Sequence, residues 1–333
     1  MIFLTGASGV VGREILPLIP AERLISGRHR TSTGGKAREV AIDIRQEKLG
    51  LSMDAYRALC HEVTVVLHCA AITDMSKTAP GVEETNIEGV RNIIALARDA
   101  NAALHYVSTA YCSEAHVHIP PEGSAYIETK RAAETLVRQS DVEWTMIRPS
   151  IVAGHSTTGA IASFQGFHLF IAAMLKGRMQ IIPLEPSARC DFVPADIVAA
   201  GIAQITQAPV WGRTYWLTAG AQALTIEDMI EVGQPFARRM GRDLSMLTLM
   251  APDEMQREIL PSLPRRLRER VEMLIGLSSV MATPAAFPSD TNTILGPGEQ
   301  VSSASLKQCL AANIRYWADA QGQHFPAGHR ALV

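Results

Sequence analysis

Short runs of consecutive apolar residues recur along the first half of the chain, separated by stretches with helical spacing of Leu, Ile, Val and Ala. The apolar runs span residues 1–4, 22–26, 39–44, 63–69, 104–109 and 144–148, and the helical stretches span residues 9–18, 82–99 and 125–139. Continuous apolar runs are typical of strands that are covered on both faces. Strands that alternate with helices predict an α/β fold with a doubly wound parallel sheet.

The alternation weakens after about residue 150, where Pro, Gly and Ser interrupt the apolar runs. A chain of 333 residues suits one large domain or two intimately packed ones, and we expect two. Residues 1–150 are expected to form the parallel-sheet domain, with some later segments packing back on it. Residues 151–333 are expected to form mainly a smaller α/β domain that binds substrate.

Two stretches of the second half have helical periodicity with more than one interpretation. The basic segment at 264–276 (PRRLRERVEMLIG) predicts an amphipathic helix with a solvated face, or alternatively a lid or a docking surface for a carrier. The spacing of Phe164, Phe167, Ile171 and Met174 favours ordinary core packing, with the lining of an apolar substrate tunnel as the alternative.

Composition and charge narrow the range of partners and compartments. The net charge of −2 provides no general field that would attract nucleic acid or an anionic membrane. The five cysteines are scattered without C-x-x-C spacing, which argues against a disulfide framework and a zinc site. No apolar run reaches the roughly 18 residues that span a bilayer, and no basic leader precedes the first strand. We therefore expect a cytoplasmic protein without bound metal.

Glycines at positions 6, 9 and 12 follow the first apolar run, in the stretch TGASGVVG. Bare backbone at such a loop can approach a phosphate closely, which favours a pyrophosphate-binding turn. The spacing is G-x-x-G-x-x-G rather than G-x-G-x-x-G, so this interpretation depends on the residues that follow the loop. We expect Gly6 to allow the turn, Gly9 the approach of the pyrophosphate, and Gly12 the packing of helix on sheet. A tight strand-to-helix turn that binds no ligand is the alternative.

Two arginines and an aspartate lie where an adenosine ribose would be bound. Arg28 and Arg30 close the second strand region, and Asp43 lies at the end of the third. An acidic residue at the end of the second strand favours a free 2′-hydroxyl, whereas the planar fork of arginine pairs with phosphate. NADP (NADPH) is therefore expected rather than NAD, unless both arginines are simply solvated.

Tyr126 and Lys130 stand four residues apart in the helix-forming stretch SAYIETKRAAE. This spacing places both side chains on one face of a helix. An ammonium close to a phenol is expected to lower the pKa of the tyrosine and make it a usable general acid or base.

Together with their order, these motifs resemble the extended short-chain dehydrogenase/reductase family over about the first 200 residues. The matching stretches are TGASGVVG (5–12), LHCAA (67–71), TNIEGVRNI (85–93), the Tyr126/Lys130 pair and RPSIVAG (148–154). The resemblance implies that Thr109 hydrogen-bonds the reacting oxygen, that Tyr126 transfers the proton, and that Lys130 holds the nicotinamide ribose. Ser108 is the alternative hydroxyl if the alignment shifts by one residue.

The resemblance also implies a set of cofactor-binding residues, with Asn86 as a positioning residue among them. The set comprises Gly6, Ser8, Gly9, Val10, Val11, Gly12, Arg28, Arg30, Asp43, Ile44, Cys69, Ala70, Ala71, Asn86, Ser108, Tyr126, Lys130, Pro149, Ser150 and Ile151.

Within the family, the stretches 108–111, 128–134, 148–168 and 190–202 are similar to thioester reductase domains and fatty acyl-CoA reductases. Sugar-nucleotide dehydratases follow the catalytic threonine with an Asp-Glu pair, whereas this chain has Ala110 and Tyr111 there. We therefore expect a free-standing, NADPH-dependent reductase of an acyl thioester or related carbonyl compound, free or bound to a carrier protein. The alternatives are an NAD-dependent sugar-nucleotide epimerase and a non-enzymatic cofactor-sensing protein.

Overall fold

The computed structural model describes residues 1–73, 80–113, 125–164, 166–176, 181–185, 188–281, 283, 285–298 and 300–322. Its centre is a parallel sheet of seven strands. In spatial order these are β11 (Thr214–Leu217), β6 (Trp144–Pro149), β5 (Ala103–Val107), β4 (Val65–His68), β1 (Ile2–Thr5), β2 (Leu24–Arg28) and β3 (Arg38–Ala41). This order confirms the predicted doubly wound fold, and each apolar run of the first half overlaps one of the strands β1 to β6.

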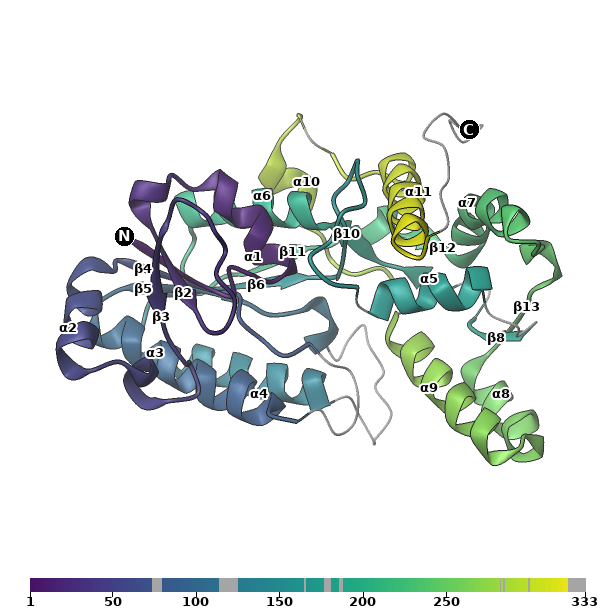
Figure 1. Cartoon of the computed structure of the whole chain (residues 1–333), viewed down its shortest axis with the longest axis horizontal. Helices are drawn as coiled ribbons and strands as arrows, with labels where there is room; N and C mark the ends of the chain where they lie inside the picture. Colours follow the sequence, from purple (N-terminus) through teal and green to yellow (C-terminus); the bar gives the residue numbers. More distant parts are fainter. Residues whose placement is uncertain are drawn as a thin grey trace.

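Helices cover both faces of the sheet (Figure 1). The helices are α1 (Val10–Ile15), α2 (Met53–Glu62), α3 (Gly89–Asp99), α4 (Ala125–Gln139), α5 (Gly166–Lys176), α6 (Ala195–Gln207), α7 (Ile226–Arg239), α8 (Pro252–Glu258), α9 (Arg265–Met281), α10 (Thr291–Leu295) and α11 (Ser303–Ala320). Helices α1 and α6 lie on one face, and α2, α3 and α4 lie on the other (Figure 1).

Neighbouring residues of one strand enter different cores, which explains why the inner strands of the sheet are mainly apolar. Phe3 packs on the α2–α4 side with Ile93 and Val137, while Leu4 packs on the α1–α6 side with Ile15 and Val198. Both Phe3 and Leu4 are fully buried. An alternating pattern would leave one of these faces without its apolar contacts.

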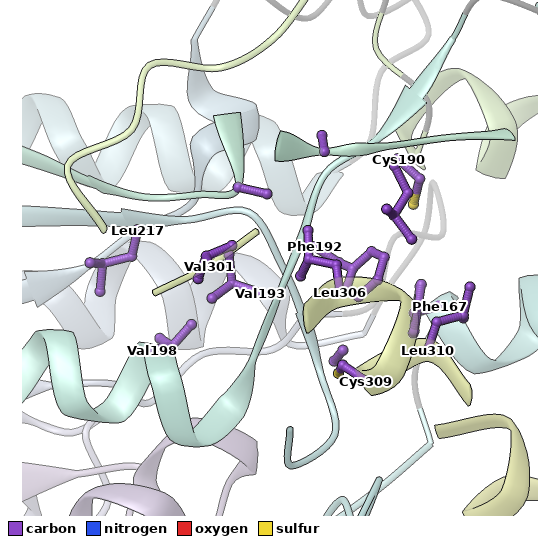
Figure 2. Packing of buried hydrophobic residues seen from close by; sticks show 14 of the residues in the cluster. Phe167, Cys190, Phe192, Val193, Val198, Leu217, Val301, Leu306, Cys309 and Leu310 are labelled. Carbon is purple, nitrogen blue, oxygen red and sulfur yellow. The ribbon is translucent and has the colours of Figure 1, made fainter. Parts of the chain in front are cut away.

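Among the described residues, the second half of the chain adds one strand to the central sheet and builds three small two-stranded sheets. The pairs are β7 (Ile151–Ala153) with β10 (Phe192–Pro194), β9 (Arg189–Cys190) with β12 (Leu224–Thr225), and β8 (Ile181–Pro183) with β13 (Thr248–Met250). The core on the α1–α6 side continues into this half, where Phe167, Phe192, Leu306 and Leu310 pack together (Figure 2).

The two helical stretches noted in the second half both form helices. The basic stretch forms α9, which packs against α5, α8 and β8. On and beside α5, Phe167, Ile171 and Met174 are buried in the core, whereas the side chain of Phe164 is exposed. Met174 also lines a small apolar pocket between α5, β8 and α9.

Candidate active site

The glycine loop follows β1, the strand at which the strand order reverses. Strands β2 and β3 lie on one side of β1, and β4, β5 and β6 lie on the other. Gly6 has a φ of +74°, and a Cβ there would lie 2.6 Å from the backbone nitrogen of Ala70. A Cβ on Gly12 would lie 2.1 Å from the carbonyl oxygen of Gly6. Gly12 therefore allows the start of α1 to lie directly against the backbone of the turn after β1.

Gly9 is exposed, and its N–H donates a hydrogen bond to the Gly6 carbonyl at 2.9 Å. Ser8, Val10 and Val11 beside it are partly exposed. The loop thus presents backbone to solvent at the carboxyl end of β1, the place where doubly wound sheets bind nucleotides.

The turn after β4 is fastened to this loop through Thr5. The Oγ1 atom of Thr5 accepts a hydrogen bond from the backbone N–H of Ala70 at 3.3 Å and lies 2.7 Å from Nδ1 of His68. The N–H of Cys69 donates to the carbonyl of Thr5. Cys69, Ala70 and Ala71 are half-buried, so this turn forms the wall of the loop.

Charged side chains gather at the ends of β2 and β3. Nε of Arg28 lies 3.5 Å from Oε2 of Glu39, and Arg30 is exposed two residues further on. Hydrogen bonds from Arg45 lower the pKa of Asp43 to about 2. The adjacent Ile44 is buried, and its carbonyl accepts a hydrogen bond from Asn92. Arg28 thus ends β2 beside the carboxylate of Glu39, and Arg30 follows it on the surface.

The carboxyl ends of β5 and β6 meet the start of α4 at a buried Thr–Tyr–Lys group. The Thr109 side chain lies near enough to Tyr126 to lower the pKa of its phenol, and the Thr109 hydroxyl donates to the carbonyl oxygen of Pro149 at 3.5 Å. Nζ of Lys130 donates to the carbonyl of Val107 at 2.7 Å and lies 4.2 Å from the centre of the Tyr106 ring.

The electrostatics of the tyrosine differ from our expectation. Burial raises the pKa of Tyr126 above its usual value, and the nearby Thr109 side chain opposes that shift only in part. Burial lowers the pKa of Lys130 to about 8, while Cys112 and Glu134 act in the opposite direction. The lysine does not lower the pKa of Tyr126 because burial dominates and its ammonium is directed at Val107 and Tyr106.

Asn86 is buried in a π-helical turn (Glu84–Glu88) and connects two parts of the site. Its side-chain oxygen accepts from the N–H of Ile72, and its amide donates to the Ile72 carbonyl and to Oγ1 of Thr129. The Thr129 hydroxyl donates to the carbonyl of Tyr126. Asn86 therefore joins the loop after β4 to the first turn of α4.

The hydroxyls of Ser108 and Thr109, which the sequence left as alternatives, have different partners in the structure. Ser108 donates its hydroxyl proton to Oε1 of Glu134 at 2.6 Å, whereas Thr109 faces Tyr126. Beyond Pro149, Ser150 is buried and the N–H of Ile151 donates to the carbonyl of Asp191, a residue of the second half.

Two residues of this site were not singled out from the sequence. Glu134 lies one turn beyond Lys130, and Arg148 is the penultimate residue of β6. Their side chains form an ion pair in which Glu134 is buried and Arg148 is partly buried. The repeat of four in Tyr126, Lys130 and Glu134, and an arginine inside an apolar run, are signals that could have found them.

A glycine turn after β1, a turn of small residues after β4, and a Thr–Tyr pair beside a lysine define an extended short-chain dehydrogenase/reductase, as the sequence predicted. The chain belongs to the NAD-binding family described as "Male sterility protein", whose sequence profile matches residues 20–123 and 119–202. None of the helices in the described part of the chain has the length and apolar content needed to cross a membrane.

Three individual proteins that resemble this chain share a quarter or less of its residues over the matched length. Aldehyde reductase lnaA of Aspergillus flavus is 25% identical over 275 residues, which cover 68% of this chain and 26% of lnaA. The chain thus spans about a quarter of that relative. Among solved structures, the terminal R domain of the myxalamid PKS-NRPS pathway has a TM-score of 0.75 at 24% identity, covering 96% of this chain and 90% of that domain. The R domain of a Mycobacterium tuberculosis non-ribosomal peptide synthetase has a TM-score of 0.67 at 19% identity, with coverages of 97% and 92%. These two likenesses show the fold.

Proposed function

We propose that this protein is an NADPH-dependent reductase that converts an acyl thioester to an aldehyde. The observation that carries the proposal is the buried group of Thr109, Tyr126 and Lys130 at the carboxyl end of the sheet. Ala110 and Tyr111 stand where a dehydratase would need two carboxyl groups, which favours reduction over elimination. The likeness to R domains and to an aldehyde reductase supports the same class of reaction.

The loop around Gly6 and Gly9 fits a dinucleotide. A side chain at Gly6 would collide with the Ala70 backbone, and Gly9 is exposed, so the loop is shaped for close approach by a phosphate. Arg28 and Arg30 would contact the 2′-phosphate, with Glu39 orienting Arg28. NADPH supplies a hydride when bound.

The hydroxyls of Thr109 and Tyr126 would donate hydrogen bonds to the thioester carbonyl oxygen, where negative charge develops as the hydride adds to the carbon. The raised pKa of Tyr126 keeps the phenol protonated at neutral pH, which is the form that reduction requires. Tyr126 then gives its proton to the oxygen. As the carbon–sulfur bond of the resulting hemithioacetal breaks, its hydroxyl proton returns to the Tyr126 phenolate. The departing thiolate takes a proton from water, so aldehyde and thiol are released.

The thioester would be presented as a coenzyme A ester or on a carrier protein. The named R domains belong to PKS-NRPS and peptide-synthetase systems, so we propose a carrier-bound acyl group as the first candidate. Helix α9 has two consecutive arginines at its exposed start, Arg265 and Arg266, which suit the acidic surface of such a partner.

The proposal is tested by incubating the protein and NADPH with matched acyl-CoA, acyl-carrier, aldehyde, ketone and UDP-sugar substrates. We expect oxidation of NADPH together with release of aldehyde and thiol from a thioester, as measured by mass spectrometry. Reduction of the aldehyde or ketone alone would contradict the thioester assignment. Interconversion of sugars without net use of cofactor would contradict the reductase assignment as well.

A further inference from the structure

Three consecutive residues at the end of β5 each contact one face of α4. The carbonyl of Val107 accepts from Lys130, the hydroxyl of Ser108 donates to Glu134, and the side chain of Thr109 lies near enough to Tyr126 to affect its pKa. The three partners on α4 are spaced four residues apart, so they lie along one side of the helix. The contacts therefore fix the register of the strand end against the helix.

Of the three residues on this face of α4, Glu134 takes part in the most hydrogen bonds. It is only 4% exposed, and its Oε1 accepts from Ser108 at 2.6 Å and from Nε of Arg148 at 2.8 Å. Its other oxygen accepts a second hydrogen bond from Arg148 and one from Arg138 at 3.3 Å. Arg148 in turn lies 4.8 Å over the ring of Trp216 in β11. One carboxylate thus joins β5, β6 and α4.

The charge state of Glu134 agrees with this role. Burial raises its pKa, but hydrogen bonds from Arg148 and Ser108 outweigh burial and hold the pKa below its usual value. An ionised carboxylate only accepts hydrogen bonds, so both oxygens remain directed at these donors. The Ser108 hydroxyl is accordingly held away from Thr109 and Tyr126.

We propose that Glu134 is a positioning residue of the reaction: by binding Ser108, it holds the strand end in the register that places Thr109 against Tyr126. The kinetic part of this inference rests on the proposed reductase function. A displacement of a reacting group by about 1 Å costs as much as a hundredfold in rate, so a register contact of this kind affects turnover more than cofactor binding.

The test uses Ser108→Ala, Glu134→Gln and the double variant that combines these two changes. The control is Glu128→Gln, at an exposed position of the same helix. Ser108→Ala removes the contact but leaves the Glu134–Arg148 ion pair in place, so it stays informative if Glu134→Gln folds poorly. We expect each single change to lower kcat roughly tenfold with an unchanged NADPH Kd, and the double variant to lose no more than the worse single one.

A second readout does not depend on activity. We expect hydrogen–deuterium exchange of the peptide covering residues 104–113 to be faster in Ser108→Ala than in the wild type, and unchanged in Glu128→Gln. Unchanged exchange, an unchanged kcat, or additive losses would overturn the positioning role. If the wild type reduces no carbonyl compound, the proposed function is wrong, and the exchange measurement alone decides the role of Glu134.

Discussion

The protonation state of Tyr126 is set by its surroundings and suits a reductase. Burial raises the pKa of this phenol, and burial lowers the pKa of Lys130 to about 8. In the proposed reaction the tyrosine would therefore act as an acid, while Lys130 is held by the Val107 carbonyl and the face of the Tyr106 ring. A proton donor beside a developing oxyanion is what carbonyl reduction needs.

Replacing Tyr126 by Phe removes this proton but keeps the ring and its packing against Tyr111 and Phe287. We expect kcat to fall by about 10²- to 10⁴-fold, the range for loss of a positioned general acid, with little change in NADPH affinity. Steady-state kinetics and fluorescence titration measure the two quantities. A variant that keeps wild-type kcat would show that another group donates the proton.

Replacing Arg28 by Ala tests the choice of cofactor. A charge-assisted contact to phosphate is worth about 1.5–3 kcal/mol, so the Kd for NADPH should rise at least roughly tenfold while the Kd for NADH hardly changes. Calorimetry on Arg57→Ala, an exposed arginine of α2, provides the control. Equal losses for both cofactors would mean that Arg28, through Glu39, serves the structure of β2 and β3 instead.

At the scale of elements, the glycines of the loop have two different roles: two of them are required by close backbone packing, and one is exposed to solvent. Gly6 and Gly12 are fixed by close backbone approaches, whereas Gly9 is exposed and its Cβ would meet only the Gly6 carbonyl, at 3.2 Å. A substitution at Gly9 should therefore weaken cofactor binding, whereas a substitution at Gly6 should lower the stability of the fold.

Gly9→Val is expected to abolish NADPH binding while the melting temperature changes little. Gly6→Ala is expected to destabilise the fold, since a left-handed conformation alone costs an alanine about 1–2 kcal/mol and the Ala70 backbone lies in the way. Calorimetric binding and thermal unfolding of both variants provide the comparison. Wild-type affinity in Gly9→Val would remove the pyrophosphate assignment.

The elements that could be predicted from the sequence are those whose own residues form a recognisable apolar pattern. Strands β1, β2, β4, β5 and β6 are largely buried, so their apolar runs are continuous and visible, whereas the edge strand β3 is exposed or partly exposed. Strands β9 and β12 have two residues each, too few for any periodicity. The contact of Arg28 with Glu39 depends on the pairing of β2 with β3, and that of Ser108 with Glu134 on helix packing; neither follows from spacing in the sequence.

Across the whole molecule, buried histidines make the fold sensitive to acid. Burial lowers the pKa of His68 to about 3 and of His105 and His168 to about 4. In the unfolded chain these groups take up protons below about pH 6.5, whereas in the fold they stay neutral. Their contribution to stability is therefore present above pH 6.5 and is lost as the pH falls below it.

We expect the free energy of unfolding to fall between pH 6.5 and 4.5 by on the order of 1 kcal/mol per pH unit for each of these histidines. His105→Asn should reduce that slope, and His61→Gln, at an exposed position on α2, should leave it as in the wild type. Urea unfolding at several pH values measures the slopes. A slope unaltered by His105→Asn would mean that this side chain is not held neutral.

The most direct measurement of the central claim follows a hydride into product. An acyl thioester is incubated with the protein and NADPH that carries deuterium at the transferred position, and the products are analysed by mass spectrometry. The account predicts an aldehyde that carries deuterium on its carbonyl carbon, with thiol released in step with NADPH oxidation and both lost in Tyr126→Phe. Recovery of intact thioester, or release of thiol with an unlabelled acid as product, would contradict it.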